Sequence, residues 1–233
     1  MGRLSIVATP IGNLEDITLR ALRTLLECDV VYAEDTRVVA KLLARHNIRK
    51  PLQRLDAVTE MRKADDIIAR LEAGEHVAFV SDAGTPGISD PGARLVAAVR
   101  THFGQSLALA TVRIEAIPGA SALTAALSIA GMDTEGFTFL GFLPHKKGRQ
   151  TALKSISESK LPVVLYESPH RILKLLEELV QHQVLHIVIA RELTKIHEEV
   201  VSGTPAEVLA HFATHPDTVR GEFVVIIDTG SRR

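Results

Sequence analysis

The stretch 81–92, with sequence SDAGTPGISDPG, has the residue types of a ligand-binding loop. It contains three glycines and two prolines. Glycine lets a backbone approach a bound molecule closely, and proline restricts the loop to few conformations. Its twelve residues are many for a strand-to-helix connection, which usually takes about 2–6 residues. We therefore predict that this loop binds a ligand; the alternative is a structural connection with no ligand.

Four other segments with unusual residues follow apolar runs that resemble strands. They are 9–13 (TPIGN), 34–37 (EDTR), 118–121 (PGAS) and 167–171 (ESPHR). The carboxyl ends of parallel strands meet at one edge of a sheet, and ligands bind there in open α/β folds. We therefore expect the segments of the first half to lie beside 81–92. The alternative for the acids at 34–35 is that they only stabilise the start of a helix.

Two groups of basic residues have the charge needed to bind phosphate. Arg37, Lys41 and Arg45 are spaced four residues apart on a predicted helix, so they share one face. The second group consists of Lys146, Lys147 and Arg149. Phosphate contacts of this kind give salt-dependent affinity for nucleic acid. No aromatic residue interleaves with either group, so base stacking is not indicated, and a solvated surface is the alternative for both.

Strand and helix patterns alternate along the chain, which indicates an α/β fold. Strands are predicted at 4–8, 30–33, 76–80, 113–117, 137–142, 162–166, 186–190 and 221–228. Helices are predicted at 14–27, 36–45, 62–73, 91–100, 122–130, 150–157, 172–181 and 204–213, the fourth with Asp90 as N-cap and Pro91 at its first position. Residues 50–59 fit neither pattern clearly.

The polar, glycine-flanked segment 131–136 is the expected boundary between two domains. The first, 1–131, is predicted to hold a mostly parallel sheet with helices on both faces and the glycine-rich loop. The second, 137–233, has fewer helices and is predicted to form a smaller, mixed sheet. No internal repeat or low-complexity tract interrupts either half.

Composition excludes several functional classes. The 233 residues carry a net charge of −1, so no overall basic field attracts nucleic acid or membrane. Cys28 is the single cysteine, which excludes a disulfide framework and a thiolate zinc cluster and fits a cytosolic setting. Phosphate-loop, dinucleotide and His-Glu-x-x-His patterns are lacking, so no metal is expected. No run reaches the about 18 apolar residues of a membrane span, and no signal peptide is expected.

Seven motifs, in order along the chain, resemble one family. They are 7–14 (VATPIGNL), 33–37 (AEDTR), 81–92, 118–122 (PGASA), 166–171 (YESPHR), 191–195 (RELTK) and 221–224 (GEFV). This set is similar to the ribosomal RNA small subunit methyltransferase I family, which belongs to the tetrapyrrole-methylase-like, class III methyltransferases that use S-adenosyl-L-methionine. The resemblance covers nearly the whole chain.

The resemblance implies two α/β domains with the cofactor in the cleft that the second domain completes, in a homodimer without metal. It implies 2′-O-methylation of the ribose of a cytidine in the decoding region of 16S ribosomal RNA. The expected cofactor-binding residues, by match to the family, are Pro10, Asp82, Ala83, Gly84, Thr85, Ile88, Ser121, Ala122, Tyr166, Glu192 and Gly221.

The reaction that the resemblance implies needs a proton acceptor for a ribose hydroxyl. We nominate Asp35 or Glu34 for it, with Arg37, Arg191 and Lys195 to hold phosphate or orient the ribose. The basic groups described above are the expected RNA contacts. Two alternatives remain open: a tetrapyrrole (precorrin-type) carbon methyltransferase, and a catalytically impaired RNA-binding relative.

The chain departs from the family pattern in one internal segment. Relatives usually carry a histidine-rich segment where this chain has LDAVTE at 55–60, of which Glu60 alone matches. Any RNA contact or catalytic help from those histidines is therefore expected to be missing. Many relatives also continue beyond the position of Asp228, and a contact from such an extension is likewise not expected.

Overall fold

The apolar runs of the first half pair into a parallel sheet. In the computed structural model, which describes residues 1–104, 112–132, 135–228 and 230, the chain divides into two units, Met1–Ser121 and Ala122–Arg233. The first unit orders its strands β3-β2-β4-β1-β5, all parallel. Their bounds are β1 (Gly2–Val7), β2 (Val30–Ala33), β3 (Leu52–Arg54), β4 (His76–Val80) and β5 (Val112–Ile117).

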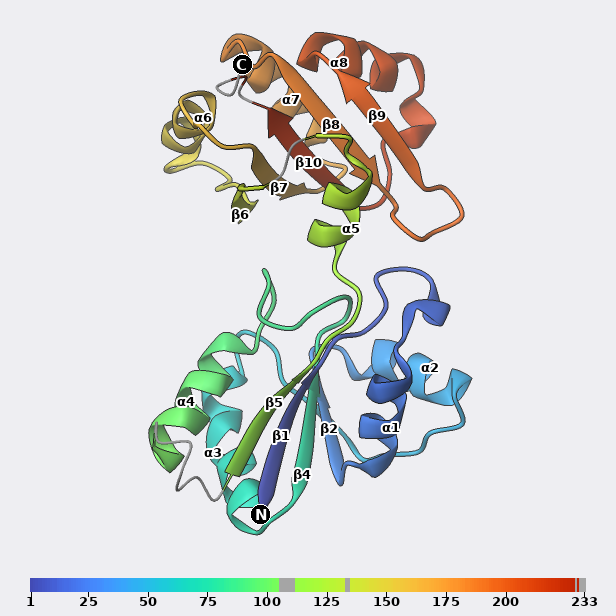
Figure 1. The fold of residues 1–233 in the computed structure, drawn as a ribbon, viewed down its shortest axis with the longest axis vertical. Helices are drawn as coiled ribbons and strands as arrows, with labels where there is room; N and C mark the ends of the chain where they lie inside the picture. The colour runs from blue at the N-terminus through green and yellow to red at the C-terminus, as the bar shows by residue number, and fades with distance from the viewer. Residues whose placement is uncertain (105–111, 133–134, 229, 231–233) are drawn as a thin grey trace. The chain divides into compact units, whose positions relative to one another are not determined.

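Helices cover both faces of this sheet, as predicted (Figure 1). They are α1 (Leu19–Glu27), α2 (Thr36–Arg45), α3 (Glu60–Glu72) and α4 (Ala93–Phe103). Apolar side chains of α3 and α4 pack against Leu4, Val77 and Phe79 on one face. Those of α1 and α2 pack against Val7, Val31 and Ala78 on the other. Because both faces are covered, the central strands are mostly apolar, although β1 also carries Arg3 and the buried Ser5.

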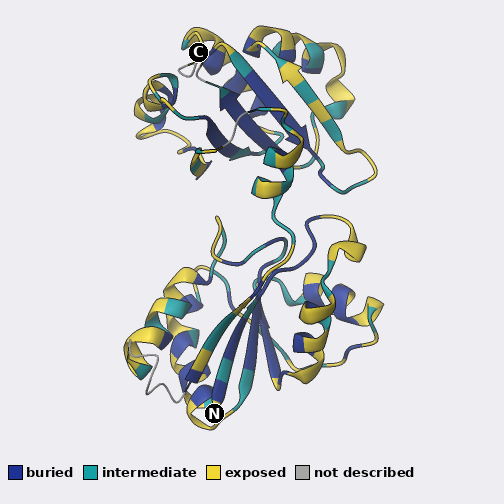
Figure 2. Cartoon of the chain, in the orientation of Figure 1, coloured by how far each residue is buried: buried dark blue, intermediate teal, exposed yellow. Residues whose placement is uncertain are grey.

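The second unit has a mixed sheet, again as predicted. Its strands are β6 (Thr138–Phe142), β7 (Val163–Glu167), β8 (His186–Arg191), β9 (Glu199–Gly203) and β10 (Phe223–Asp228), in the order β6-β7-β10-β8-β9. Only β6 and β7 pair in parallel. The helices are α5 (Ala122–Ile129), α6 (Arg149–Ser157), α7 (Ile172–Gln181) and α8 (Pro205–Thr214). Side chains of α6, α7 and α8 share one core with this sheet. The inner strands β7, β8 and β10 are mostly buried (Figure 2).

One predicted element needs correction, and two strands of the structure were not predicted. The helix expected over 14–27 is a 3-10 turn, Leu14–Asp16, followed by α1. Two capping side chains cause the break, since Asn13 accepts from the N–H of Glu15 and Thr18 accepts from that of Ala21. Strand β9 was not predicted; it is an edge strand of alternating exposure. The ambiguous segment contains the short strand β3.

The start of α4 also differs from the prediction. The N-cap is Gly92, so Asp90 does not cap the helix and Pro91 precedes it. The buried carboxylate of Glu60, on α3, performs the capping: its Oε1 accepts from the N–H groups of Gly92 and Leu95, both at 2.9 Å. The cap therefore comes from a neighbouring helix, which local sequence cannot reveal.

Arg149 is buried in the second unit rather than exposed in a basic turn. Its Nη2 donates to Glu178 Oε2 at 2.7 Å and its Nη1 to the carbonyl of Pro144 at 3.3 Å. Glu167, also buried, lies 3.9 Å from the same guanidinium and accepts from Arg171 Nε at 2.6 Å. Arg149 thus neutralises buried carboxylates, and we withdraw it from the expected RNA contacts.

We predict that Arg149→Met lowers the free energy of unfolding by about 3–5 kcal/mol, because Glu178 is left buried without its cation. Urea denaturation followed by circular dichroism measures the loss. The double variant Arg149→Met/Glu178→Leu should recover most of it, since an apolar pair replaces a buried ion pair at little cost. The exposed Lys147→Met is the control and should stay within about 0.5 kcal/mol of wild type. A loss no larger than that of the control contradicts the prediction.

Candidate functional site

The loops that follow β1, β4 and β5 meet at the carboxyl edge of the parallel sheet. Thr9 and Gly84 exchange two backbone hydrogen bonds, of 2.9 and 3.0 Å. The hydroxyl of Thr85 donates to the carbonyl of Ala120 at 3.2 Å. The loop that follows β2 joins them, because the N–H of Asp35 donates to Asp82 Oδ1 at 2.8 Å. The predicted meeting of these segments is therefore confirmed.

The glycine-rich loop needs its glycines for backbone conformation. Gly84, Gly87 and Gly92 have φ values of 78°, 83° and 128°, in the region that side chains disfavour. The loop turns back on itself, since the N–H of Gly87 donates to the carbonyl of Pro91 at 3.0 Å. Residues 87–89 are exposed and include the apolar side chain of Ile88. The exposed part of the loop therefore includes an apolar side chain, and ligand binding by the loop stays a prediction.

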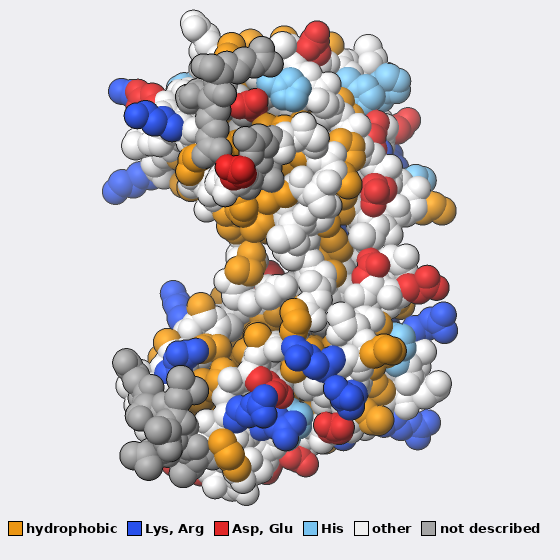
Figure 3. All heavy atoms as spheres, in the orientation of Figure 1, with side chains coloured by type: hydrophobic (Ala, Val, Ile, Leu, Met, Phe, Trp, Pro, Cys, Tyr) orange, Lys and Arg blue, Asp and Glu red, His pale blue; other side chains and the backbone are white. Residues whose placement is uncertain are grey.

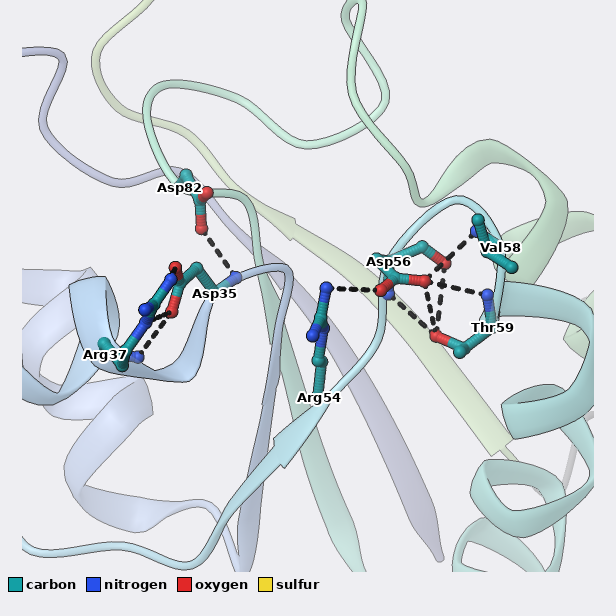
Figure 4. A network of polar contacts seen from close by, with 7 residues as sticks. All are labelled: Asp35, Arg37, Arg54, Asp56, Val58, Thr59 and Asp82. Carbon is teal, nitrogen blue, oxygen red and sulfur yellow. Dashed lines mark hydrogen bonds and ion pairs between the residues drawn. The ribbon is translucent and has the colours of Figure 1, made fainter.

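Of the two nominated carboxylates, Asp35 is committed to a structural role (Figure 4). It is the N-cap of α2, with Oδ1 accepting from the N–H of Arg37 at 2.8 Å. The guanidinium of Arg37 also donates from Nε to both carboxylate oxygens, at 3.0 and 3.1 Å. These hydrogen bonds hold the pKa of Asp35 far below its usual range. A carboxylate so stabilised is a weak proton acceptor.

Glu34, the neighbouring acid, has the opposite environment. Burial raises the pKa of Glu34 above 4.5, and the nearby carboxylates of Asp82 and Asp56 raise it further, while Arg54 lowers it. A raised pKa makes the ionised carboxylate a stronger base near neutral pH. Glu34 is therefore the better proton acceptor of the two.

Arg54 and Asp56 belong to this environment, although the sequence analysis did not single them out. They form an ion pair of 2.9 Å, and Asp56 Oδ1 accepts from the N–H groups of Val58 and Thr59 at 3.1 and 2.9 Å (Figure 4). An Asp followed three residues later by Thr, just before a helix, is a capping pattern. This spacing is the sequence signal from which the role of Asp56 could have been predicted.

The basic residues predicted to contact RNA are exposed, apart from Arg149. Lys41 and Arg45 are exposed on α2, and Lys146 and Lys147 are exposed on the turn before α6. Arg37 keeps an exposed side chain while bound to Asp35. The predicted stripe on α2 thus exists as a surface.

In the second unit, Arg191 and Lys195 are both paired with acids. Arg191 is buried, and its Nε donates to Glu199 Oε2 at 2.5 Å. The other oxygen of this carboxylate, Oε1, lies 3.0 Å from His211 Nε2. Lys195 Nζ contacts Glu192 at 2.8 Å and Glu222 at 3.1 Å. Burial lowers the pKa of Lys195, but these two acids outweigh it and raise the pKa, so the lysine stays charged.

Glu192 crosses directly over Gly221. Its φ is 50°, and its Oε1 accepts from the N–H of Glu222 at 3.1 Å as well as from Lys195. A Cβ on Gly221 would lie 2.0 Å from that same oxygen, and Gly221 itself has a φ of 80°. The side chain of Glu192 can therefore keep this position only if residue 221 is a glycine.

Tyr166 lies in an aromatic cluster at the edge of the second sheet. Its ring meets Phe139 and Phe142 edge-on, with centroids 5.0 and 5.7 Å apart. Phe142 and Leu140 are half exposed on β6, and Figure 3 shows apolar side chains gathered over β6 and α5. The remaining expected cofactor residues are Pro10, which is buried, Ser121, which ends the first unit, and Ala122, which begins α5.

Two features are absent from the described part of the chain. No cluster of three or more His, Cys, Asp or Glu side chains there has the arrangement of a metal site. None of its helices has the length and apolarity needed to cross a membrane.

Comparison with known proteins assigns the chain to a family. The family described as Tetrapyrrole (Corrin/Porphyrin) Methylases matches residues 3–209. A Thermotoga maritima protein named ribosomal RNA small subunit methyltransferase I is 40% identical over 230 residues, or 97% of this chain and 98% of the relative. The Synechocystis protein of the same name is 44% identical, covering 97% of this chain and 79% of the relative. The chain belongs to the ribosomal RNA small subunit methyltransferase I family, within the Tetrapyrrole (Corrin/Porphyrin) Methylases.

The resemblance identified from the motifs is thereby confirmed, and the chain is a methyltransferase. Solved structures agree on the fold. The diphthine synthase structure superposes with a TM-score of 0.72 at 17% identity, covering 97% of this chain and 89% of the other. The cobalt precorrin-4 methyltransferase structure gives 0.68 at 18% identity, with 97% and 94% covered. At such identities the similarity concerns the fold alone.

In this methyltransferase we predict that Gly221→Ala displaces Glu192 and lowers the free energy of unfolding by about 2–4 kcal/mol, from the positive φ and the clash together. Chemical denaturation measures it. Gly131→Ala is the matched control, because Gly131 has a φ of 65° but no atom within 4 Å of an added Cβ. Adding Glu192→Ala should remove the clash and reduce the Gly221→Ala cost to that of the control. Equal costs for both single glycine variants would refute the close contact.

Proposed function

We propose that this chain transfers a methyl group from S-adenosyl-L-methionine to the 2′-hydroxyl of a cytidine ribose in the decoding region of 16S ribosomal RNA. The observation that carries the proposal is the 40–44% identity, over 97% of the chain, to relatives named ribosomal RNA small subunit methyltransferase I. The activity would be cytoplasmic, where its substrate, the small ribosomal subunit or its RNA, is found.

The residues present fit the cofactor. From the first unit we assign the backbone of Asp82, Ala83, Gly84 and Thr85, with Pro10, Ile88 and Ser121; from the second, Ala122, Tyr166, Glu192 and Gly221. Glycine backbones allow close approach, and Ile88 offers an exposed apolar contact. S-adenosyl-L-methionine supplies an electrophilic methyl group on a sulfonium. One structure of the fold, a uroporphyrin-III C-methyltransferase, is described as complexed with S-adenosyl homocysteine.

Glu34 is assigned as the acceptor of the ribose hydroxyl proton. A hydroxyl is a poor nucleophile until its proton is taken, and general-base help of this kind contributes about 10²–10⁴ in rate. Asp35 holds Arg37 at the start of α2, and Arg37 with Lys41 and Arg45 offers cations to RNA phosphates. Lys146 and Lys147 are assigned as further RNA contacts. Lys195, bound by Glu192 and Glu222, is assigned to orient Glu192, and Arg191, bound by Glu199, to join the ends of β8 and β9.

We also propose that the chain acts as a homodimer. The half-exposed apolar side chains of β6, which is an edge strand, support pairing, since monomers rarely expose large apolar patches. Sedimentation equilibrium tests it: a single-chain mass at micromolar concentration would rule the dimer out.

The proposed function is tested by offering three substrate classes in parallel. Purified enzyme with tritiated S-adenosyl-L-methionine is incubated with small ribosomal subunits, with naked 16S RNA and with a tetrapyrrole. Label in RNA, mapped to a cytidine 2′-oxygen by resistance to alkaline cleavage, supports the proposal. Label in the tetrapyrrole alone favours carbon methylation, and donor binding without label in any acceptor favours an impaired RNA-binding relative.

We predict that Glu34→Gln lowers kcat by about 10²–10⁴-fold, with donor affinity unchanged, whereas Asp35→Asn changes kcat less. In wild type, kcat should rise with pH through the raised pKa of Glu34, above 4.5, because only the ionised form accepts a proton. Glu34→Gln should not show this rise of kcat with pH. Pre-steady-state methyl transfer across pH measures it, and a wild-type-like profile for Glu34→Gln overturns the assignment.

The stability of Glu34→Gln provides an internal check of the same pKa. Folding raises the pKa of Glu34, so the stability that this side chain contributes is complete below its unfolded pKa and is lost as pH rises through the folded one. At neutral pH the glutamine variant should therefore unfold at the same or a higher temperature than wild type. A lower melting temperature would show that the lost activity reflects damage to the fold.

For the α2 surface we predict that Lys41→Ala weakens RNA binding and reduces the slope of log affinity against log salt by about 0.7–0.9 per lost phosphate contact. Fluorescence anisotropy with a labelled decoding-region RNA, at several salt concentrations, measures the slope. Lys174→Ala, exposed on α7, is the control and should leave the slope unchanged. An equal slope for Lys41→Ala and wild type excludes the contact.

A further inference from the structure

Glu60 is a buried acid that the proposed chemistry does not use. It is the first residue of α3 and is 4% exposed. Its Oε1 accepts from the N–H groups of Gly92 and Leu95, both at 2.9 Å. These two groups stand where the glycine-rich loop ends and α4 begins. Glu60 therefore fixes one end of that loop.

The N-cap residue of α4 supplies no side-chain acceptor of its own. The N-cap of α4 is a glycine without a side chain to cap it, and N–H groups at a helix start need an acceptor when they are buried. Gly92 also packs tightly, since a Cβ there would lie 2.8 Å from Phe79. Hydrogen bonds to a charged acceptor are stronger than neutral ones, so loss of Glu60 releases this end of the loop.

Glu60 ends the short segment 54–60, and residues at the start of that segment influence Glu34, the proposed base. Arg54 and Asp56 pair with each other, and both influence the pKa of Glu34. The backbone of Asp56 is tied to α3, because the N–H of Glu60 donates to its carbonyl at 2.8 Å. The segment 54–60 thus connects the surroundings of Glu34 with the exit of the loop 81–92.

We propose that Glu60 is a positioning residue for methyl transfer: its carboxylate holds the exit of the glycine-rich loop in the conformation that binds the donor. The proposal rests on the proposed function, because it takes the loop 81–92 as the donor-binding loop. Glu60 itself touches neither donor nor RNA; it acts through the backbone of Gly92 and Leu95.

The test compares Glu60→Ala, Glu60→Gln and wild type in calorimetric titrations with S-adenosylhomocysteine. Glu60→Ala should bind about 10- to 100-fold more weakly, because a loosened loop exit transmits only part of the contribution of the two lost hydrogen bonds to donor binding. Glu60→Gln retains an acceptor oxygen and should recover affinity to within about 5-fold of wild type. In turnover assays KM for the donor should rise while KM for RNA stays constant.

Ile67→Val controls for lost stability, because Ile67 is fully buried on the same helix and packs in the core of the first unit. It should lower the melting temperature without changing donor affinity. Unchanged affinity for Glu60→Ala, or a loss matched by Ile67→Val at equal destabilisation, overturns the proposal and makes Glu60 a stability residue only.

Hydrogen–deuterium exchange without any ligand separates this proposal from the proposed function. Glu60→Ala should speed exchange in peptides spanning 81–95 and leave those of α1 unchanged; equal exchange in 81–95 refutes the anchor. If wild type shows the anchored loop but binds no S-adenosylhomocysteine, the donor assignment fails and the positioning role fails with it, while the anchor remains as a structural contact.

Discussion

Parallel pairing of β1 with β4 and β5 is the constraint from which the rest of the site follows. It brings the ends of three strands to one edge, where backbone hydrogen bonds between Thr9 and Gly84 join two of the loops. Because these contacts use backbone groups, they depend on conformation more than on side-chain identity. A loop held in this way can present its own N–H and C=O groups, and that is the property a small polar ligand requires.

Charge pairing is the second organising feature. Arg37 faces Asp35, Arg191 faces Glu199, and Lys195 faces Glu192 and Glu222. Partners of this kind fix side-chain positions, and exposed pairs add little stability of their own. Lys41 and Arg45 are exposed on the same helix as Arg37. Of these three cations, Arg37 is held in place by a carboxylate.

Much of this organisation was predictable from the sequence, for a physical reason. Apolar runs alternating with amphipathic helices indicate a parallel sheet, and that topology alone brings 9–13, 34–37, 81–92 and 118–121 together. The unpredicted features join residues far apart in the chain. Glu60 caps a helix that begins 33 residues later, and Arg149 pairs with Glu178, 29 residues away. Local patterns place a charge on an element but do not reveal its partner.

The choice between Glu34 and Asp35 shows why adjacency in sequence does not imply equal chemistry. Asp35 receives the backbone N–H of α2 and a guanidinium, which favour its ionised form. Glu34 is half-buried near Asp82 and Asp56, which disfavour ionisation. Two neighbouring carboxyl groups thus acquire pKa values displaced in opposite directions, the arrangement by which active sites separate a permanently charged group from one that exchanges protons. Burial and the acids at 56 and 82 raise the pKa of Glu34, whereas the local contact with Arg37 lowers that of Asp35.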